Sequence, residues 1–424
     1  MLETGNSAAP SGPQSNENLP LCRSRQGGVI ESLSEKENSL LEQKKSRLFV
    51  RQMEAYDDTL LSQAMEEIFN ASAAIQQLTA ESRVLLKPNL LAKHVPEHAV
   101  TTHPAVVRAV IRALKQRGIT RITVADSPGG VYTPAVMKPL YRQSGLQAVC
   151  EEEGAALYTA CEWGERACEH FDLVPRFSWI QPALEADCII NLPKVKTHVM
   201  MAMSCAVKNL FGLVPGLQKA EFHMRFPEKD HFARMLVDLC EAAKPALTIA
   251  DGILAMEGDG PAGGQPRELG LLLASEDPYL VDLAVCRVMN FPPEQVAYLA
   301  CAIRRNLCAA SLDLSLVEGE EALLLPRTDY RMPESYVAIN FSGKRTRAIR
   351  WLFPWLEKCA APRPVIARQR CIGCGKCAEI CPGHTIHVSG GKASIAPQNC
   401  IRCFCCHEMC PVKAIDVKRF FAFH

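Results

Sequence analysis

The sequence lacks three features that would assign it to a common class of protein. Its first residues, MLETGNSAAPSGPQSNENLP, have no basic start followed by an apolar run, so we expect no signal peptide. Its longest apolar stretches are of strand length, so we expect no integral membrane segment. Lys plus Arg (47) nearly equal Asp plus Glu (46), so there is no overall charge to attract nucleic acid. We therefore expect a cytoplasmic protein that binds no nucleic acid.

Motifs that would name an enzyme class are also missing. The sequence contains no Gly-x-Ser-x-Gly nucleophile elbow and no His-Glu-x-x-His motif. The run Ser127-Pro-Gly-Gly130 has neither the lysine of a P-loop nor the glycine spacing of a dinucleotide-binding turn. It therefore predicts no particular nucleotide.

The chain divides into regions of different composition. Residues 1–45 are rich in Ser, Asn, Gln, Glu and Pro, which predicts a disordered polar tail. From 46 to 330, β-type runs alternate with helical patterns, which predicts a three-layer α/β domain with a mostly parallel sheet. The predicted strands are 46–51, 84–89, 121–127, 188–192, 246–251 and 269–274, and the predicted helices are 58–79, 104–116, 232–243 and 279–290. A connecting segment at 331–365, with a strand at 336–341 and a Pro-rich linker, completes this part.

Cysteine, in contrast, is abundant. The chain has 20 cysteines, and its length and missing signal peptide favour a reducing compartment over disulfides. Eight of them form two copies of the pattern Cys-x-x-Cys-x-x-Cys-x-x-x-Cys-Pro. The first copy contains Cys371, Cys374, Cys377 and Cys381, and the second contains Cys400, Cys403, Cys406 and Cys410. Structural zinc is the alternative, but a third closely spaced cysteine is superfluous to a tetrahedral ion.

This pattern predicts two 4Fe–4S clusters with crossed ligands. The first three cysteines of a copy can wrap one cubane, whereas the fourth lies too far along and ligates the other cluster. We expect one cluster on Cys371, Cys374, Cys377 and Cys410, and the other on Cys400, Cys403, Cys406 and Cys381. Cys405 is expected to be a bystander, and 384–396 to form a hairpin that turns at Gly390-Gly391. Residues 366–424 resemble the bacterial-type 2(4Fe–4S) ferredoxin domain, a small α+β fold, which implies one-electron transfer.

Polar segments follow several predicted strands of the large domain, where open α/β sheets place their ligands. Their lysine and asparagine side chains can grip an anion, and their carboxylates can act as acids, bases or metal ligands. The candidate substrate-binding residues are Lys87, Asn89, Asp126, Lys194, Lys196, Lys208 and Asn209, and the candidate catalytic residues are His198 and Asp251. The alternative is that such residues only cap helices and form turns.

Three histidines offer a second candidate site. His94, His98 and His103 lie in one predicted loop, and a transition metal could bind there. However, Pro96 breaks any helix that would bring the first two onto one face.

Four segments after predicted strands, and a Gly/Pro-rich segment that carries the isolated pair Lys208-Asn209, bear a second resemblance. They are Lys87-Pro-Asn89, Asp126-Ser127, Asn191-Leu-Pro-Lys-Val-Lys-Thr-His198, Lys208-Asn-Leu-Phe-Gly212 and Asp251-Gly-Ile-Leu-Ala-Met-Glu-Gly258. Together they are similar to the Domain of Unknown Function 362 family, over about 47–300. Members often carry a C-terminal ferredoxin module. The family has no general assigned reaction, so the resemblance implies one shared pocket but no particular chemistry.

Three functions follow from these features. The first is a ferredoxin-linked oxidoreductase, in which the clusters exchange single electrons with an anionic small molecule and His198 or Asp251 moves protons. The second is an electron carrier that docks a redox partner protein, such as a ferredoxin or a reductase, without a substrate of its own. The third is a metabolite-binding or maturation factor whose clusters are structural or sense the redox state.

Overall fold

The structure is a computed structural model that describes residues 46–336 and 361–419. The predicted disordered tail over 1–45 lies outside these ranges. So does the predicted strand at 336–341, except for Tyr336, which ends a 3-10 turn, η6 (Glu334–Tyr336). No helix within the described ranges is long and apolar enough to cross a lipid bilayer.

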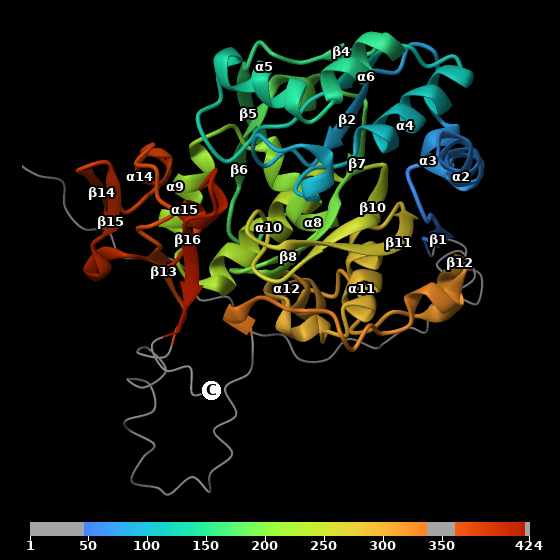
Figure 1. The fold of residues 1–424 in the computed structure, drawn as a ribbon. Coiled ribbons are helices and arrows are strands. Elements are labelled where there is room, and N and C mark those ends of the chain that lie inside the picture. The colour runs from blue at the N-terminus through green and yellow to red at the C-terminus, as the bar shows by residue number, and fades with distance from the viewer. Residues whose placement is uncertain (1–45, 337–360, 420–424) are drawn as a thin grey trace, which may run out of the picture. The chain divides into compact units, whose positions relative to one another are not determined.

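A ten-stranded mixed sheet forms the centre of the large domain (Figure 1). Its parallel part has the spatial order β4 (Ala156–Leu157), β3 (Ile122–Val124), β2 (Val84–Pro88), β7 (Cys188–Leu192) and β10 (Leu247–Glu257). Beyond β10, β11 (Gln265–Ser275) runs antiparallel to both of its neighbours, followed by β1 (Leu48–Gln52) and β12 (Val317–Gly319). Strand β8 (Lys194–His198) branches off β10 and pairs with β9 (Ala202–Ser204). The prediction of a mostly parallel sheet is confirmed.

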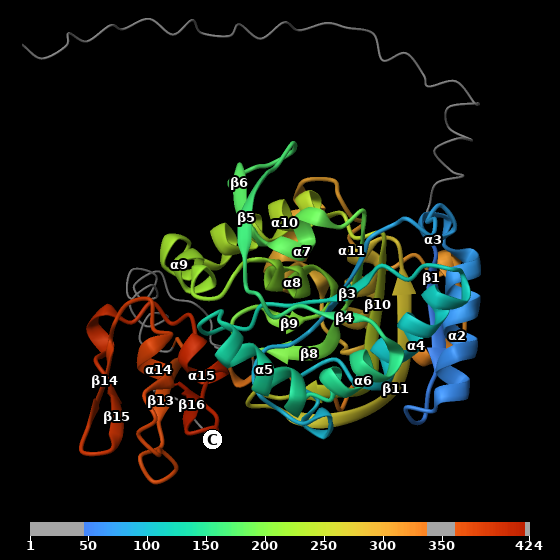
Figure 2. The same cartoon turned by 90° about the horizontal axis from the view of Figure 1, so that it is seen from above.

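Helices cover both faces of this sheet (Figure 2). One group contains α2 (Asp58–Ala71), α4 (Pro104–Gln116), α5 (Pro134–Gln143) and α6 (Leu146–Glu153), and the other contains α8 (Ala206–Asn209), α10 (Lys229–Ala243), α11 (Pro278–Val288) and α12 (Ala297–Arg304). Successive strand residues enter opposite cores, since Val84 and Leu86 pack with the first group and Leu85 with the second. Strands covered on both faces need continuous apolar runs, which is why these segments could be recognised in the sequence.

Local capping explains where some elements end. The predicted helix at 58–79 is interrupted at Ser72, whose hydroxyl accepts a hydrogen bond from the amide of Ile75 and so starts a separate short helix, α3 (Ala73–Gln76). The shorter elements of the large domain are a hairpin of β5 (Trp163–Ala167) and β6 (Arg176–Ile180), followed by α7 (Gln181–Glu185) and α9 (Gln218–Arg225).

The small C-terminal module is built from short elements around the cysteines. Strand β13 (Arg363–Ile366) pairs antiparallel with β16 (Ile415–Lys418), so the module already includes residues before 366. The hairpin of β14 (Ile386–Ser389) and β15 (Lys392–Ile395) turns at Gly390-Gly391, both at positive φ, as predicted. Two one-turn helices, α14 (Lys376–Glu379) and α15 (Cys405–Glu408), follow the cysteine loops.

Candidate functional site

The eight patterned cysteines gather around two cavities of the small module. The first cysteine site is lined by Cys371, Cys374, Cys377 and Cys410. The second cysteine site is lined by Cys381, Cys400, Cys403 and Cys406. The chain therefore brings together the crossed sets expected from the spacing, with the fourth cysteine of each copy in the other copy's site.

Backbone amides point at the cysteine sulfurs. The amides of Ala393 and Ala414 donate to the sulfurs of Cys371 and Cys410, over 3.3 and 3.1 Å. Thr385 donates its amide to the sulfur of Cys381 over 3.4 Å. Such N–H···S bonds stabilise thiolates, the form in which cysteine binds iron, and they tune the reduction potential of iron–sulfur clusters. The donor set and its hydrogen bonds therefore fit 4Fe–4S clusters.

The described residues of 46–336 and 361–419 belong to one compact unit, and the small module packs on the large domain. The two ring nitrogens of His407 face the carbonyl oxygens of Ile415 and Asp259, at 2.6 and 2.9 Å. Gly263 leaves room for this ring, because a Cβ there would lie 2.6 Å from it. Lys413 donates to the carbonyl of Gly264 over 3.1 Å. These contacts hold the module against the loop that connects β10 and β11.

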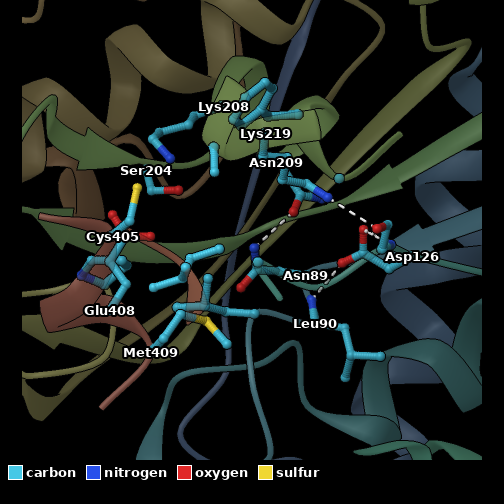
Figure 3. A pocket seen from close by; sticks show the side chains of 18 of the residues that line it. Asn89, Leu90, Asp126, Ser204, Lys208, Asn209, Lys219, Cys405, Glu408 and Met409 are labelled. Carbon is cyan, nitrogen blue, oxygen red and sulfur yellow. Dashed lines mark hydrogen bonds between the residues drawn. The ribbon is translucent and has the colours of Figure 1, made fainter. Parts of the chain in front are cut away.

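Where the two parts meet, they enclose a cavity that we call the lysine pocket (Figure 3). Its volume is about 70 Å³, room for a molecule of a few heavy atoms. The large domain contributes Asn89, Asp126, Ser127, Lys196, Ser204, Lys208, Asn209, Lys219 and His223, and the small module contributes Ile380, Cys405, Glu408 and Met409. Cys405 immediately precedes Cys406, so the lysine pocket adjoins the second cysteine site.

Three lysines of this pocket make no direct contact with any carboxylate of the described residues. Lys196 donates to the side-chain oxygen of Asn89 and to the carbonyl of Val100, over 2.7 and 2.8 Å. Lys219 donates to the hydroxyl of Ser127 over 3.0 Å and to backbone carbonyls. Burial, with positive neighbours, lowers the pKa of both lysines to about 7. Both contribute positive charge to the pocket at neutral pH and below.

Lys208 differs from the other two because its ammonium makes no hydrogen bond or ion pair with any described residue. Its side chain extends from α8 toward Ser204 and Cys405 (Figure 3). Burial lowers its pKa, and the nearby Glu408 opposes that effect. The side chain is half-buried, and its nearest ring neighbour is Phe211, 6.0 Å from the ammonium. Because no carboxylate among the described residues neutralises it, this ammonium suits a ligand that brings its own negative charge.

A chain of amide groups orders one wall of the pocket. The amide of Asn89 donates to Asn209 over 2.9 Å, and Asn209 donates in turn to Asn191 over 2.8 Å. Asn191 donates to the carbonyl of Ala206 over 2.9 Å, at the start of α8. Because every link fixes the next, this network orients the oxygen that Asn89 offers to Lys196.

Two buried histidines lie beside the pocket. Nε2 of His198 is 3.2 Å from Oε1 of Glu408. Nδ1 of His198 accepts a hydrogen bond from the amide of Met200, so the proton of the neutral ring is on Nε2 and faces the carboxylate. Burial lowers the pKa of His198 to about 4 and that of His223 to about 3. Nδ1 of His223 has no hydrogen-bond partner among the described residues, and its ring stacks on Phe232.

Two predicted site residues, Lys87 and Asp126, form a buried ion pair at the pocket wall, 2.8 Å apart. The carboxylate of Asp126 also accepts from the amides of Leu90 and Ser127, so its oxygens are occupied. Gly212 makes this packing possible, since a Cβ there would lie 1.9 Å from Oδ1 of Asp126. The pair orders the loops after β2 and β3.

The predicted residues Lys194 and Asp251 lie outside the pocket in a network of their own. Their ammonium and carboxylate are 2.8 Å apart, and Tyr56 donates its hydroxyl to the same carboxylate over 2.9 Å. Burial and the charge of Asp251 raise the pKa of Tyr56. The amide of His103 donates to Asp251 over 2.9 Å, and its ring stacks on Tyr56 at 3.5 Å. The structure thus divides the expected shared site into a pocket and a separate buried network.

The three histidines of the predicted loop do not converge. Nδ1 of His94 faces Nδ1 of His98 at 3.2 Å. His103 instead caps α4 by accepting from the amide of Ala105. Within 46–336 and 361–419, no three His, Cys, Asp or Glu side chains are close enough to hold a single metal ion.

Sequence reasoning did not single out four polar residues of the pocket. They are Ser204, Lys219, His223 and Glu408. Lys219 and His223 lie four residues apart on α9, a spacing that places them on one helix face and could have indicated a shared surface. Nothing in the sequence near Glu408 indicates that it reaches the large domain.

Comparisons with known proteins agree with this two-part architecture. A domain of unknown function, DUF362, matches residues 84–287, and a 4Fe-4S dicluster domain matches residues 363–411. The thylakoid-associated protein sll1697 of Synechocystis sp. (strain ATCC 27184 / PCC 6803 / Kazusa) is 35% identical over 271 residues, which cover 62% of this chain and 80% of that protein. The lactate racemase apoprotein from Thermoanaerobacterium thermosaccharolyticum is 11% identical over 59% of this chain and 57% of that chain, with a TM-score of 0.35. A TM-score this low supports no argument about fold or activity.

Proposed function

Because the chain belongs to the family with the domain of unknown function 362, in a form that carries a 4Fe-4S dicluster domain, we propose that it is an oxidoreductase that exchanges single electrons with a small anion in the lysine pocket. The observation that carries the proposal is Lys208. Its half-buried ammonium makes no hydrogen bond or ion pair with the described residues and lies 6.0 Å from the centre of the Phe211 ring. It faces the cavity and lies close to Cys405, the neighbour of a predicted cluster ligand.

We infer that the two cysteine sites hold one 4Fe–4S cluster each. The crossed grouping of the cysteines and the amide donors to their sulfurs support this assignment. Bound clusters would supply or accept one electron at a time. The expected setting is the reducing cytoplasm, where the thiolates stay available to iron.

The pocket residues have separate tasks in this proposal. Lys208 binds the anion directly, while Lys196 and Lys219, held by neutral oxygens, add positive charge to the walls. The side chain of His223, with an unpaired ring nitrogen, offers a further polar contact. His198 delivers or takes up a proton through Glu408, which lines the pocket. Asp251 has no such role, because Lys194, Tyr56 and the amide of His103 occupy its oxygens.

The test is reoxidation of the reduced protein by a small anion. The anaerobically purified protein is reduced with dithionite, freed of excess reductant and mixed with a panel of small carboxylates, phosphate and sulfur oxyanions. We expect at least one anion to restore the visible absorbance of the clusters, and Lys208→Ala to slow that reaction about a hundredfold. The exposed Lys244→Ala is the matched control and should react as the wild type does.

The same experiment separates the enzyme from a plain electron carrier. A carrier would be reoxidised by other redox proteins but by no anion of the panel. A structural role for the clusters predicts that dithionite does not reduce them. Either result would overturn the proposal.

A further inference from the structure

The small module has a charge balance unlike that of the rest of the chain. Residues 361–419 contain nine Lys or Arg and three Asp or Glu, a net charge of +6, whereas the whole chain carries +1. One of the three acidic residues, Glu408, is directed into the lysine pocket, and another, Asp416, is paired with Arg370. Basic side chains therefore outnumber the free carboxylates of the module.

The two cysteine sites differ in their exposure on the surface of the module. Cys374 of the first site is exposed, whereas no cysteine of the second site is. Ile372 and Val412 also line the first site, and they are 62% and 37% exposed. The first site thus reaches the surface among apolar side chains, while the second adjoins the lysine pocket.

Basic side chains flank the exposed cysteine. Arg368 and Lys376 are both exposed, and neither makes a hydrogen bond or an ion pair with any residue in 46–336 or 361–419. Lys376 also lines an open cleft of about 250 Å³ together with Lys93 of the large domain. Glu379 is the nearest exposed acidic residue in the sequence. Its single negative charge does not balance the two positive charges of Arg368 and Lys376.

We propose that this basic face, formed by Arg368, Ile372, Cys374, Lys376 and Val412, docks an acidic one-electron carrier protein. The inference rests on the proposed function, because it supplies the electrons that the lysine pocket uses. One electron leaves the flavin or iron–sulfur group of the carrier and enters the cluster of the first cysteine site, with no bond formed or broken. Arg368 and Lys376 attract and orient the carrier electrostatically as it approaches. Ile372 and Val412 form the apolar centre of the contact, from which water is excluded.

A protein partner explains the surface better than a nucleic acid or a lipid surface. Exposed apolar side chains beside a redox-active cysteine site are typical of small, transient electron-transfer interfaces, with an apolar centre and a charged rim. A phosphate backbone or a lipid headgroup would need the basic residues but not the apolar centre. Charge complementarity then makes the carrier acidic.

The test uses an acidic flavodoxin as the probe and the anaerobically purified full chain. Binding is measured by titration calorimetry at low salt and at about 0.5 M NaCl, where exposed charges are screened. We expect binding at low salt, loss of binding at high salt, and an affinity at least about tenfold lower in the double variant Arg368→Glu with Lys376→Glu. Lys244→Glu, a charge reversal on an exposed residue after α10, is the matched control and should bind like the wild type. Iron and sulfide contents show whether each variant keeps its clusters.

Three results would overturn the proposal. They are equal binding of the flavodoxin by the double variant and the wild type, tighter binding of the basic protein cytochrome c, and binding of phosphatidylglycerol vesicles or single-stranded DNA in place of the flavodoxin. The outcome is separable from that of the proposed function. Reoxidation by an anion after dithionite reduction bypasses the basic face, so the double variant should retain it even if the carrier no longer binds.

Discussion

Nε2 of His198, at the end of β8, lies 3.2 Å from Oε1 of Glu408, in the one-turn helix α15 of the small module. Both atoms are shielded from solvent, and neither makes a hydrogen bond of good geometry with a described residue, so this close contact is their only polar interaction there. Glu408 follows Cys406 by two residues, so this contact connects the second cysteine site with the pocket wall.

The His198–Glu408 contact is expected to stabilise the docked module. His198→Ala leaves a shielded carboxylate without its nearest partner, which should lower the free energy of unfolding by about 1–3 kcal/mol. Urea unfolding of the anaerobic protein measures this change. His231→Ala is the control, because its 3.5 Å contact with Glu228 is exposed and should contribute less than about 1 kcal/mol. Equal effects of the two variants would contradict a buried coupling.

The predicted lysines should fall into two groups on mutation. Lys194→Ala leaves Asp251 buried without its cation and should cost about 3–5 kcal/mol of stability. Lys208→Ala removes a half-buried cation that makes no ion pair, so it should leave stability nearly unchanged while anion binding is lost. Thermal unfolding and titration with oxalate measure the two effects. A large loss of stability in Lys208→Ala would show that this lysine is structural.

Anion binding is expected to weaken as the pH rises through about 7. Burial lowers the pKa of Lys196 and of Lys219 to about 7, so both are charged below that pH and neutral above it. Oxalate keeps its charge between about pH 6 and 9, so its affinity should fall about tenfold over that range. Lys219→Met should flatten the profile, and a pH-independent affinity in the wild type would contradict this account.

The same two lysines should make the free energy of unfolding increase as the pH rises, whereas they make the affinity for the anion decrease. The unfolded chain keeps a lysine protonated up to about pH 10.4, whereas the folded chain releases the proton near 7. The unfolded state therefore binds more protons between these values, and the free energy of unfolding should rise with pH across that window. Urea unfolding at several pH values measures this slope, and Lys219→Met should reduce it.

Iron analysis tests the assignment of the cysteines. Two clusters predict about eight iron and eight sulfide per chain. Cys405→Ser should keep the full content, because this thiol lines the lysine pocket and not a cysteine site. Cys381→Ser should impair the cluster of the second copy, although this residue belongs to the first copy. Loss of the first copy's cluster instead would contradict the crossed grouping.

The sequence alone predicted most strands of the parallel sheet and the grouping of the eight patterned cysteines. Continuous apolar runs such as 188–192 predicted strands covered on both faces, because burial on two sides excludes polar side chains. The spacing of the eight cysteines predicted the crossed sets that line the two cavities, because short loops limit which thiolates can meet one cubane. Both inferences use patterns formed by residues close in the chain, although the contacts that they predict join distant segments.

Only the tertiary structure decided which polar residues form the pocket. Lys194 begins β8 and Lys208 lies in α8, and both were predicted to bind the same anion, yet one is neutralised by Asp251 and the other faces the cavity. Glu408 reaches His198 from the small module, across 210 residues of chain. A lysine is neutralised when a carboxylate lies within about 3 Å of its ammonium, and otherwise it remains available to bind a ligand. Packing between distant segments sets that distance.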